Sequence, residues 1–259
     1  MAGTGFRQIR LLILLALLLF VAVGSWVSRF QTRDWDRPLR VVLYPINGDG
    51  RSTTSTYIQS LDEEDFQPVE AFLAREAERY GLVLNRPAEI YLAGELHDHP
   101  PEPPRDGNIL TVMAWSLKLR FWVWLVDHWD GPDAQIRIFV IYHDPQVRQR
   151  VPHSLGLEKG LIGVVHAFAS PAQRDQNQVI VAHELLHTLG ATDKYDPASN
   201  LPYYPIGFAE PGRQPRFPQR YAEIMGGRVP VSPRQAEIPE SLEQVQVGEV
   251  TALEIQWLQ

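Results

Sequence analysis

Two histidines and a glutamate stand at a spacing that suits a metal ion. The segment VIVAHELLHTLGATDKYD contains His183, Glu184 and His187 in an HExxH pattern. On a helix, residues four positions apart lie on one face, one turn apart, so both imidazoles can bind a single ion. Glu184 lies beside that face, where its carboxylate can reach a water molecule on the metal. Zinc accepts nitrogen and oxygen ligands and leaves a position for water, so the pattern predicts a site for Zn²⁺.

Such a site needs a third protein ligand, and the residues after the helix offer one. Gly190 follows His187 by three residues and can adopt the positive φ that ends a helix and reverses the chain. Asp193, three residues further on, is then close enough to place a carboxylate on the same ion. A downstream acid such as Glu210 or Glu223 is the alternative ligand. We expect Asp193, because Gly190 supplies the turn that it needs.

The residues from His183 to Asp193 resemble the metzincin signature HExxHxxGxxH, with Asp193 in place of its third His. Asp in that place is similar to the snapalysin-like peptidases, and the string HTLGATDKYD resembles the immune-inhibitor-A-like secreted peptidases. Metzincins also carry a Met-containing turn beneath the metal, which Ile224-Met225-Gly226-Gly227 resembles. The Asp ligand and a long Pro- and Tyr-rich loop depart from the signature and leave the subfamily and the substrate open.

The resemblance implies a metzincin-like zincin domain with a mixed twisted sheet, and peptide hydrolysis as its activity. Glu184 would then act as the general base toward a metal-activated water, and zinc with a Tyr hydroxyl would stabilise the oxyanion. The strand expected just before the metal helix, residues 161–169, would bind an extended peptide by edge pairing. The candidate hydroxyls, among which the sequence does not choose, are those of Tyr195, Tyr203, Tyr204 and Tyr221.

The composition excludes several other function classes. The 259 residues contain no Cys, so disulfide frameworks, Cys-ligated zinc, iron–sulfur clusters and thiol nucleophiles are all excluded. Asp and Glu number 31 against 24 Lys and Arg, for a net charge of −7, which argues against nucleic acid as the main partner. The hydrophobic share of 44% is enough to build a real core in one ordinary domain.

The amino terminus indicates a membrane segment. Residues 11–28 carry no charge, and Arg7 and Arg10 stand just before them. A run of that length can cross a bilayer, and it also suits a signal peptide cleaved near Gly24. We expect an anchor or signal in residues 1–30 and one zinc metallopeptidase domain in residues 31–259, on the extracytoplasmic side of the membrane or secreted if the segment is cleaved. The sequence does not indicate an oligomeric state.

Hydrophobic periodicity predicts an α/β or α+β domain with a mixed sheet. A long helix expected at 108–128 carries Lys118 and Arg120 in its middle, which argue against a second membrane span. Its tryptophans and Trp129 are expected to serve packing. Strands are expected at residues 39–46, 89–93, 135–142 and 161–169, helices at 62–80, 108–128, about 171–189 and 247–258, and loops at 47–56, 97–107 and 197–223.

Two other function classes stay open beside an endopeptidase acting on protein or peptide. The same ligands would serve a zinc hydrolase of a non-protein amide, such as one in a cell wall. A membrane-anchored binding protein with a structural or vestigial metal site is the second class, although Glu184 argues against it because structural sites fill the fourth position with another ligand. His166 is expected in an ordinary surface or packing role, and His97 and His99 in a loop.

Overall fold

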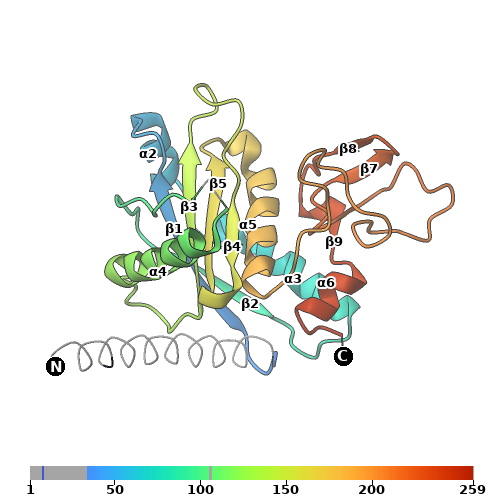
Figure 1. The fold of residues 1–259 in the computed structure, drawn as a ribbon, viewed down its shortest axis with the longest axis horizontal. Helices are drawn as coiled ribbons and strands as arrows, with labels where there is room; N and C mark the ends of the chain where they lie inside the picture. Colours follow the sequence, from blue (N-terminus) through green and yellow to red (C-terminus); the bar gives the residue numbers. More distant parts are fainter. Residues whose placement is uncertain (1–7, 9–33, 105–106, 259) are drawn as a thin grey trace.

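The computed structural model describes residue 8, residues 34–104 and residues 107–258, and they form a mixed α/β fold (Figure 1). The predicted segment at residues 11–28 therefore lies outside the described residues. The main elements are β1 (Leu39–Asn47), α2 (Ser52–Gln59), α3 (Gln67–Arg79), β2 (Ala88–Leu92), α4 (Ile109–Val126), β3 (Ile136–His143), β4 (Leu155–Leu157), β5 (Ile162–Phe168), α5 (Arg174–Thr188), β6 (Ala222–Glu223), β7 (Val229–Ser232), β8 (Gln235–Glu237), β9 (Val245–Gln246) and α6 (Glu249–Glu254).

A five-stranded mixed sheet is the centre of the fold. Its strand order is β2-β1-β3-β5-β4, in which β4 alone runs antiparallel to its neighbour. The middle strands β1 and β3 are buried along almost their whole length, as expected for strands covered on both faces. Side chains of successive residues point to opposite faces, so each strand contributes to two cores.

The two cores place the helices on opposite sides of the sheet. Val41 and Leu43 of β1 pack in the larger core with residues of α3 and α5. Val42 and Tyr44 belong to the smaller core, which contains Leu119 and other residues of α4. Helix α5 therefore lies against the sheet on the face away from α4, beside β4 and β5 (Figure 1).

The predicted mixed sheet and most predicted elements are confirmed, with shifts at their ends. The expected loop at residues 47–56 is wrong, because α2 begins at Ser52. Its composition, STTSTYIQ, reads as a loop, but Thr54, Tyr57 and Ile58 share one buried helix face. The predicted carboxyl-terminal helix at 247–258 is shorter than expected, since α6 ends at Glu254 and Gln256 adopts a positive φ of 64°.

The structure limits the predicted edge pairing by residues 161–169. Strand β5 pairs with β3 along its whole length, while β4 pairs only with its first three residues and leaves the edge from Val165 to Phe168 without a strand partner among the described residues. Among the described strands, β4 pairs on one side only, and it is the outer strand beside α5. This strand could not be predicted from the sequence, because Leu155–Leu157 is too short to show an alternating pattern.

Candidate metal centre

Helix α5 presents both motif histidines toward one point. His183 Nδ1 lies 2.8 Å from the Ile224 carbonyl oxygen, and His187 Nδ1 lies 2.7 Å from the Ala191 carbonyl oxygen. A ring nitrogen beside a carbonyl carries the proton and donates it, which leaves Nε2 of each ring as the metal-binding atom. The two rings stand 4.6 Å apart between centroids and nearly perpendicular, at 84°. Both histidines are thus held in the tautomer and orientation that a metal site needs.

The chain turns after α5 in the way that brings Asp193 back to the histidines. Gly190 adopts a φ of 98°, and the Ala191 amide donates to the Leu186 carbonyl oxygen at 3.0 Å. Asp193 Oδ1 lies 3.2 Å from Nε2 of His183 and 3.2 Å from Nε2 of His187. The predicted turn is confirmed, and it places the expected third carboxylate at equal distances from both rings.

The donor set fits zinc. In a tetrahedral site with ligands about 2.0–2.1 Å from the ion, neighbouring ligand atoms stand about 3.3 Å apart. The two separations of 3.2 Å between Nε2 and Oδ1 agree with that spacing. Two imidazoles and one carboxylate are also a ligand set of catalytic zinc sites, which keep a fourth position open.

His183 and Asp193 stabilise each other's charged forms. Burial alone opposes ionisation of Asp193, but hydrogen bonds from His183 and His187 hold the pKa of this carboxyl well below its usual range. Burial also opposes protonation of His183, yet the hydrogen bond to Asp193 and the charge of Glu184 raise its pKa to about 9. The metal-free site therefore carries a proton on His183 at neutral pH.

This protonation gives a prediction for the metal-free chain. In NMR titrations of its imidazoles, His183 is expected to titrate near pH 9, because Asp193 stabilises the imidazolium. Zinc must displace that proton, so zinc affinity is expected to rise with pH up to about 9. His166 is the internal reference, since burial and the neighbouring His143 lower its pKa to about 4. A midpoint for His183 below the ordinary imidazole value would contradict this electrostatic picture.

Glu184 is buried beside the candidate ligands and is 5% exposed. The ligand atoms of His183, Glu184 and His187 all lie within 4.8 Å of one another. Among the described residues nothing donates a hydrogen bond to Glu184 Oε2, so this buried oxygen is without a partner. Burial raises the pKa of the Glu184 carboxyl, although both histidines oppose the shift. A raised pKa and an unpaired oxygen suit a group that accepts a proton in the site.

The turn that contains Met225 packs directly against the metal-site residues. The Ile224 carbonyl orients His183, and the Met225 carbonyl accepts a hydrogen bond from the Lys194 amide at 2.8 Å. Met225 itself is fully buried. The structure thus brings the predicted Met-containing turn together with His183 and with the residue that follows Asp193.

The other predicted ligand candidates are engaged elsewhere. Glu210 accepts hydrogen bonds from Arg220, whose guanidinium holds the pKa of Glu210 below its usual range. Glu223 is fully buried and accepts from the Gly226 and Gly248 amides and the Thr251 hydroxyl at 2.6–3.0 Å. The predicted loop residues His97 and His99 lie in the segment between β2 and α4, and the described residues contain one histidine–carboxylate cluster of metal-binding geometry, at α5.

His166 has the packing role that the sequence predicts. Its Nδ1, on β5, lies 3.0 Å from Nε2 of His143, the last residue of β3. Burial lowers the pKa of both imidazoles, so the pair is neutral at neutral pH.

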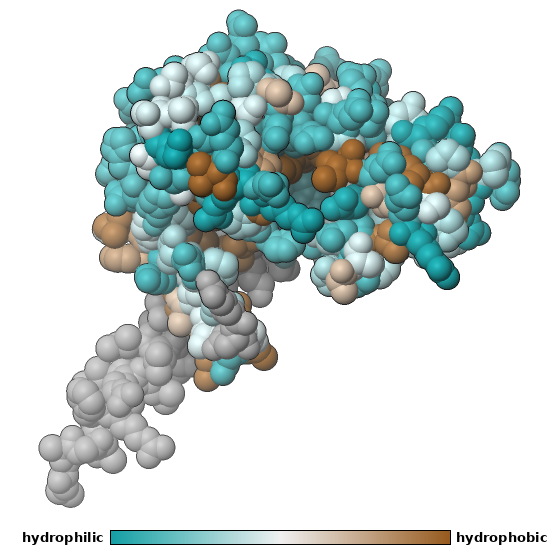
Figure 2. All heavy atoms as spheres, turned by 90° about the horizontal axis from the view of Figure 1, so that it is seen from above, coloured by the Kyte–Doolittle hydropathy of each residue, from teal (hydrophilic) through white to brown (hydrophobic). Residues whose placement is uncertain are grey.

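A cleft of about 700 Å³ opens beside the metal-site residues. Its wall includes His183, Ile180 of α5, Tyr195 and Arg228. Figure 2 views the molecule from above and shows a hollow in this face, with hydrophobic residues at its border. Of the four candidate tyrosines, Tyr195 is the one that lines this cleft. Burial and a hydrogen bond to Asp193 raise the pKa of its phenol, which therefore stays protonated.

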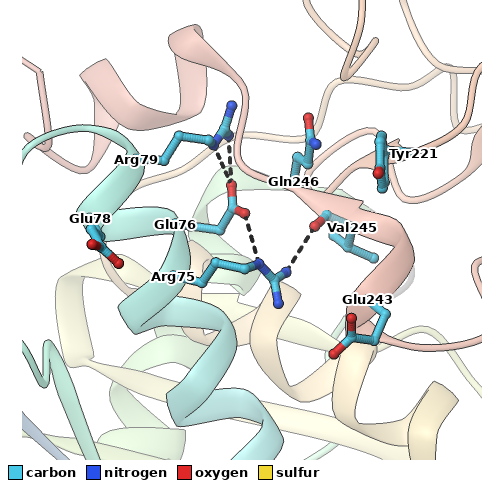
Figure 3. A pocket seen from close by; sticks show the side chains of 8 residues that line it. All are labelled: Arg75, Glu76, Glu78, Arg79, Tyr221, Glu243, Val245 and Gln246. Carbon is cyan, nitrogen blue, oxygen red and sulfur yellow. Dashed lines mark hydrogen bonds and ion pairs between the residues drawn. The ribbon is translucent and has the colours of Figure 1, made fainter.

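A second cleft, of about 460 Å³, lies between α3 and β9 and has a structural explanation (Figure 3). Glu76 is 2% exposed there and accepts hydrogen bonds from Arg75, from Arg79 and from the Val247 amide. Figure 3 shows both guanidinium groups directed at this carboxylate. The cluster ties α3 to the carboxyl-terminal segment that carries the Met-containing turn, and its carboxylate is occupied by these partners.

Two residues that hold the site in place, Lys194 and Gly156, were not predicted from the sequence. Lys194 is 1% exposed and its Nζ donates to Glu254 Oε2 at 2.7 Å, which fixes the segment after Asp193 on α6. The sequence around Lys194 does not indicate that its side chain is buried. Its partner Glu254, 60 residues away, could therefore not be predicted. Gly156 of β4 touches α5, and an isolated Gly between two Leu residues is a signal of close backbone approach.

No protein-family model and no curated protein matches this chain.

Proposed function

We propose that this chain is a zinc-dependent endopeptidase whose catalytic domain works on the extracytoplasmic side of a membrane. The observation that carries the proposal is the convergence of His183 Nε2, His187 Nε2 and Asp193 Oδ1, with the Glu184 carboxylate beside them. The mixed sheet and the buried Met225 in a turn against His183 support the metzincin-like fold that the signature implies.

Each residue of the site has its own role in the proposed hydrolysis of a peptide bond. Zinc, when held by His183, His187 and Asp193, acidifies water and polarises a carbonyl group. Glu184 takes a proton from the attacking water and passes it to the nitrogen of the leaving amine. Its buried position and raised pKa suit both steps, because the group must accept a proton and then release it near neutral pH.

Tyr195 is the proposed hydroxyl that stabilises the oxyanion. It lines the cleft beside His183, and its protonated phenol is already aligned toward Asp193. A donor fixed near the developing negative charge lowers the barrier more than the same donor in water does. Tyr203, Tyr204 and Tyr221 lie outside the lining of this cleft.

A peptide is the substrate that the surroundings favour. The outer strand β4 has a free edge among the described strands and contacts α5, so an extended chain can pair with it and pass the metal site. The described residues of the cleft wall include Arg150 and Arg228 and no acid, which favours neutral or acidic side chains of the substrate at that position.

A substrate comparison tests this proposal. The purified full chain is expected to cut a denatured protein at internal peptide bonds, to lose this activity with a zinc chelator and to regain it when zinc is returned. Cleavage of cell-wall amides without cleavage of the denatured protein would instead support the non-protein hydrolase. A zinc-loaded chain that cuts neither substrate would support the anchored binding protein.

A further inference from the structure

Helix α4 is apolar on two opposite sides, with Lys118 and Arg120 between them, and one of these sides faces the sheet. Leu119, Val123 and Val126 pack into the smaller core. On the opposite side, Leu110 is 74% exposed, Phe121 60% and Trp124 73%. Other exposed apolar residues of this helix are Ile109, Val112, Met113, Leu117 and Leu125. Val112 lies two turns before the buried Leu119 on the inner side, and we call the other seven residues the α4 outer face. A large exposed apolar patch marks a site of interaction, so this face needs an occupant.

Length and composition make α4 the one candidate membrane span among the described residues. Its packing on the sheet does not allow it to leave the domain and cross a bilayer, and Lys118 and Arg120 lie near its middle. A helix in this position can instead lie parallel to a membrane, with its outer face among the lipids and its inner face on the protein.

The membrane segment expected at residues 11–28 would hold the domain close to a bilayer. Trp35 is attached to the domain, since its indole donates to the Ile255 carbonyl oxygen at 2.8 Å and packs edge-on against Trp257. The uncharged run ends at residue 28, so six residues, 29–34, separate it from this fixed point. Six extended residues span about 20 Å. With residues 11–28 in a membrane, Trp35 would therefore lie within about 20 Å of the lipid surface.

Helix α4 lies near the end of the sheet at which β1 begins. The Arg40 amide, at the start of β1, donates to Gln135 Oε1 at 2.8 Å, and Gln135 belongs to the segment that follows α4. Figure 1 shows α4 across the lower half of the sheet, the half in which β1 begins. Trp35 itself packs on the larger core, across the sheet from α4, but the chain reaches the start of β1 only a few residues later, at the same end of the sheet as α4.

We propose that the α4 outer face docks into the surface of the bilayer that anchors residues 11–28, with Phe121 and Trp124 at the boundary between headgroups and acyl chains. Aromatic side chains are favoured at that boundary. Packing of residues 11–28 onto α4 is a poorer solution in water, because that segment is apolar on every side and would expose a new apolar surface. The docking holds the metal-site cleft at a fixed orientation relative to the membrane.

The absence of Cys makes a direct test possible. The full chain, reconstituted in phosphatidylcholine vesicles, receives a single spin label through Leu117→Cys or Phe121→Cys, with Arg234→Cys in the exposed turn between β7 and β8 as the control. Because all three side chains are exposed, the labels leave the cores intact. Far-UV circular dichroism of each labelled chain, matched to the unlabelled one, checks this.

Collisions with oxygen, which dissolves in lipid, and with a nickel complex, which stays in water, then report where each label lies. At Leu117→Cys and Phe121→Cys we expect collisions with oxygen to dominate, at a depth of about 5–10 Å below the headgroups. At Arg234→Cys we expect the nickel complex to dominate. If the labels on α4 are as accessible to the nickel complex as the label at Arg234→Cys, the α4 outer face lies in water and the proposal is overturned. Exclusion of both reagents would also overturn it, because protein would then cover the face.

Discussion

Glu184→Gln is expected to lower kcat/KM for peptide hydrolysis by about 10²–10⁴-fold without loss of zinc. The amide has nearly the same shape as the carboxylate but cannot accept the proton of the attacking water. Because Glu184 is not one of the three proposed ligands, metal content should stay at the level of the parent chain. The measurement is the hydrolysis rate of an internally quenched peptide, with zinc determined on the same samples.

Glu64→Gln is the control for this loss of one negative charge, since Glu64 is exposed in the turn before α3. It should hydrolyse the peptide at the parent rate. A Glu184→Gln chain that keeps the parent activity would remove Glu184 from the mechanism. If the same chain instead lost its zinc, Glu184 would be a metal ligand and the assignment of Asp193 would need revision.

Gly156→Ala is expected to disrupt the site from the neighbouring strand. A Cβ at this position would lie 2.4 Å from His187 Cβ and 2.7 Å from the Glu184 carbonyl oxygen, both closer than atoms can approach. Either β4 or α5 must move. Displacement of a catalytic group by about 1 Å can cost about 100-fold in rate, and overpacking costs about 1–3 kcal/mol in the free energy of unfolding.

The matched control is Gly94→Ala, because an added Cβ there meets nothing within 4 Å and its φ is not in the left-handed region. Chemical denaturation and peptide hydrolysis are measured on both variants. Equal behaviour of Gly156→Ala and Gly94→Ala would show that β4 does not lie against α5 as described.

Local patterns explain which parts of the site were predictable. The HExxH spacing, Gly190 and Asp193 lie within one short segment, so helix geometry and one turn relate them without knowledge of the rest of the fold. The apolar runs of β1 and β3 are long enough to specify buried strands. These features needed no information from distant residues.

The remaining parts depend on pairings between distant segments. The outer strand β4 has three residues, and only its register against β5 makes it a strand. Helix α2 consists mostly of Ser and Thr, and burial of Tyr57 against Tyr142 of β3 overrides that composition. The buried ion pair of Lys194 with Glu254 joins segments 60 residues apart, for which a single sequence carries no signal.

Zinc content is the most direct measure of the central claim, that His183, His187 and Asp193 hold one ion. Elemental analysis of the purified full chain, after dialysis against metal-free buffer, is expected to give one zinc per chain. Asp193→Ala should lose more than about 100-fold in zinc affinity, since even partners that only orient a ligand contribute 10–100-fold. Glu210→Ala should retain the metal. A folded parent chain without zinc, or an Asp193→Ala chain that binds zinc as tightly as the parent, would contradict the account.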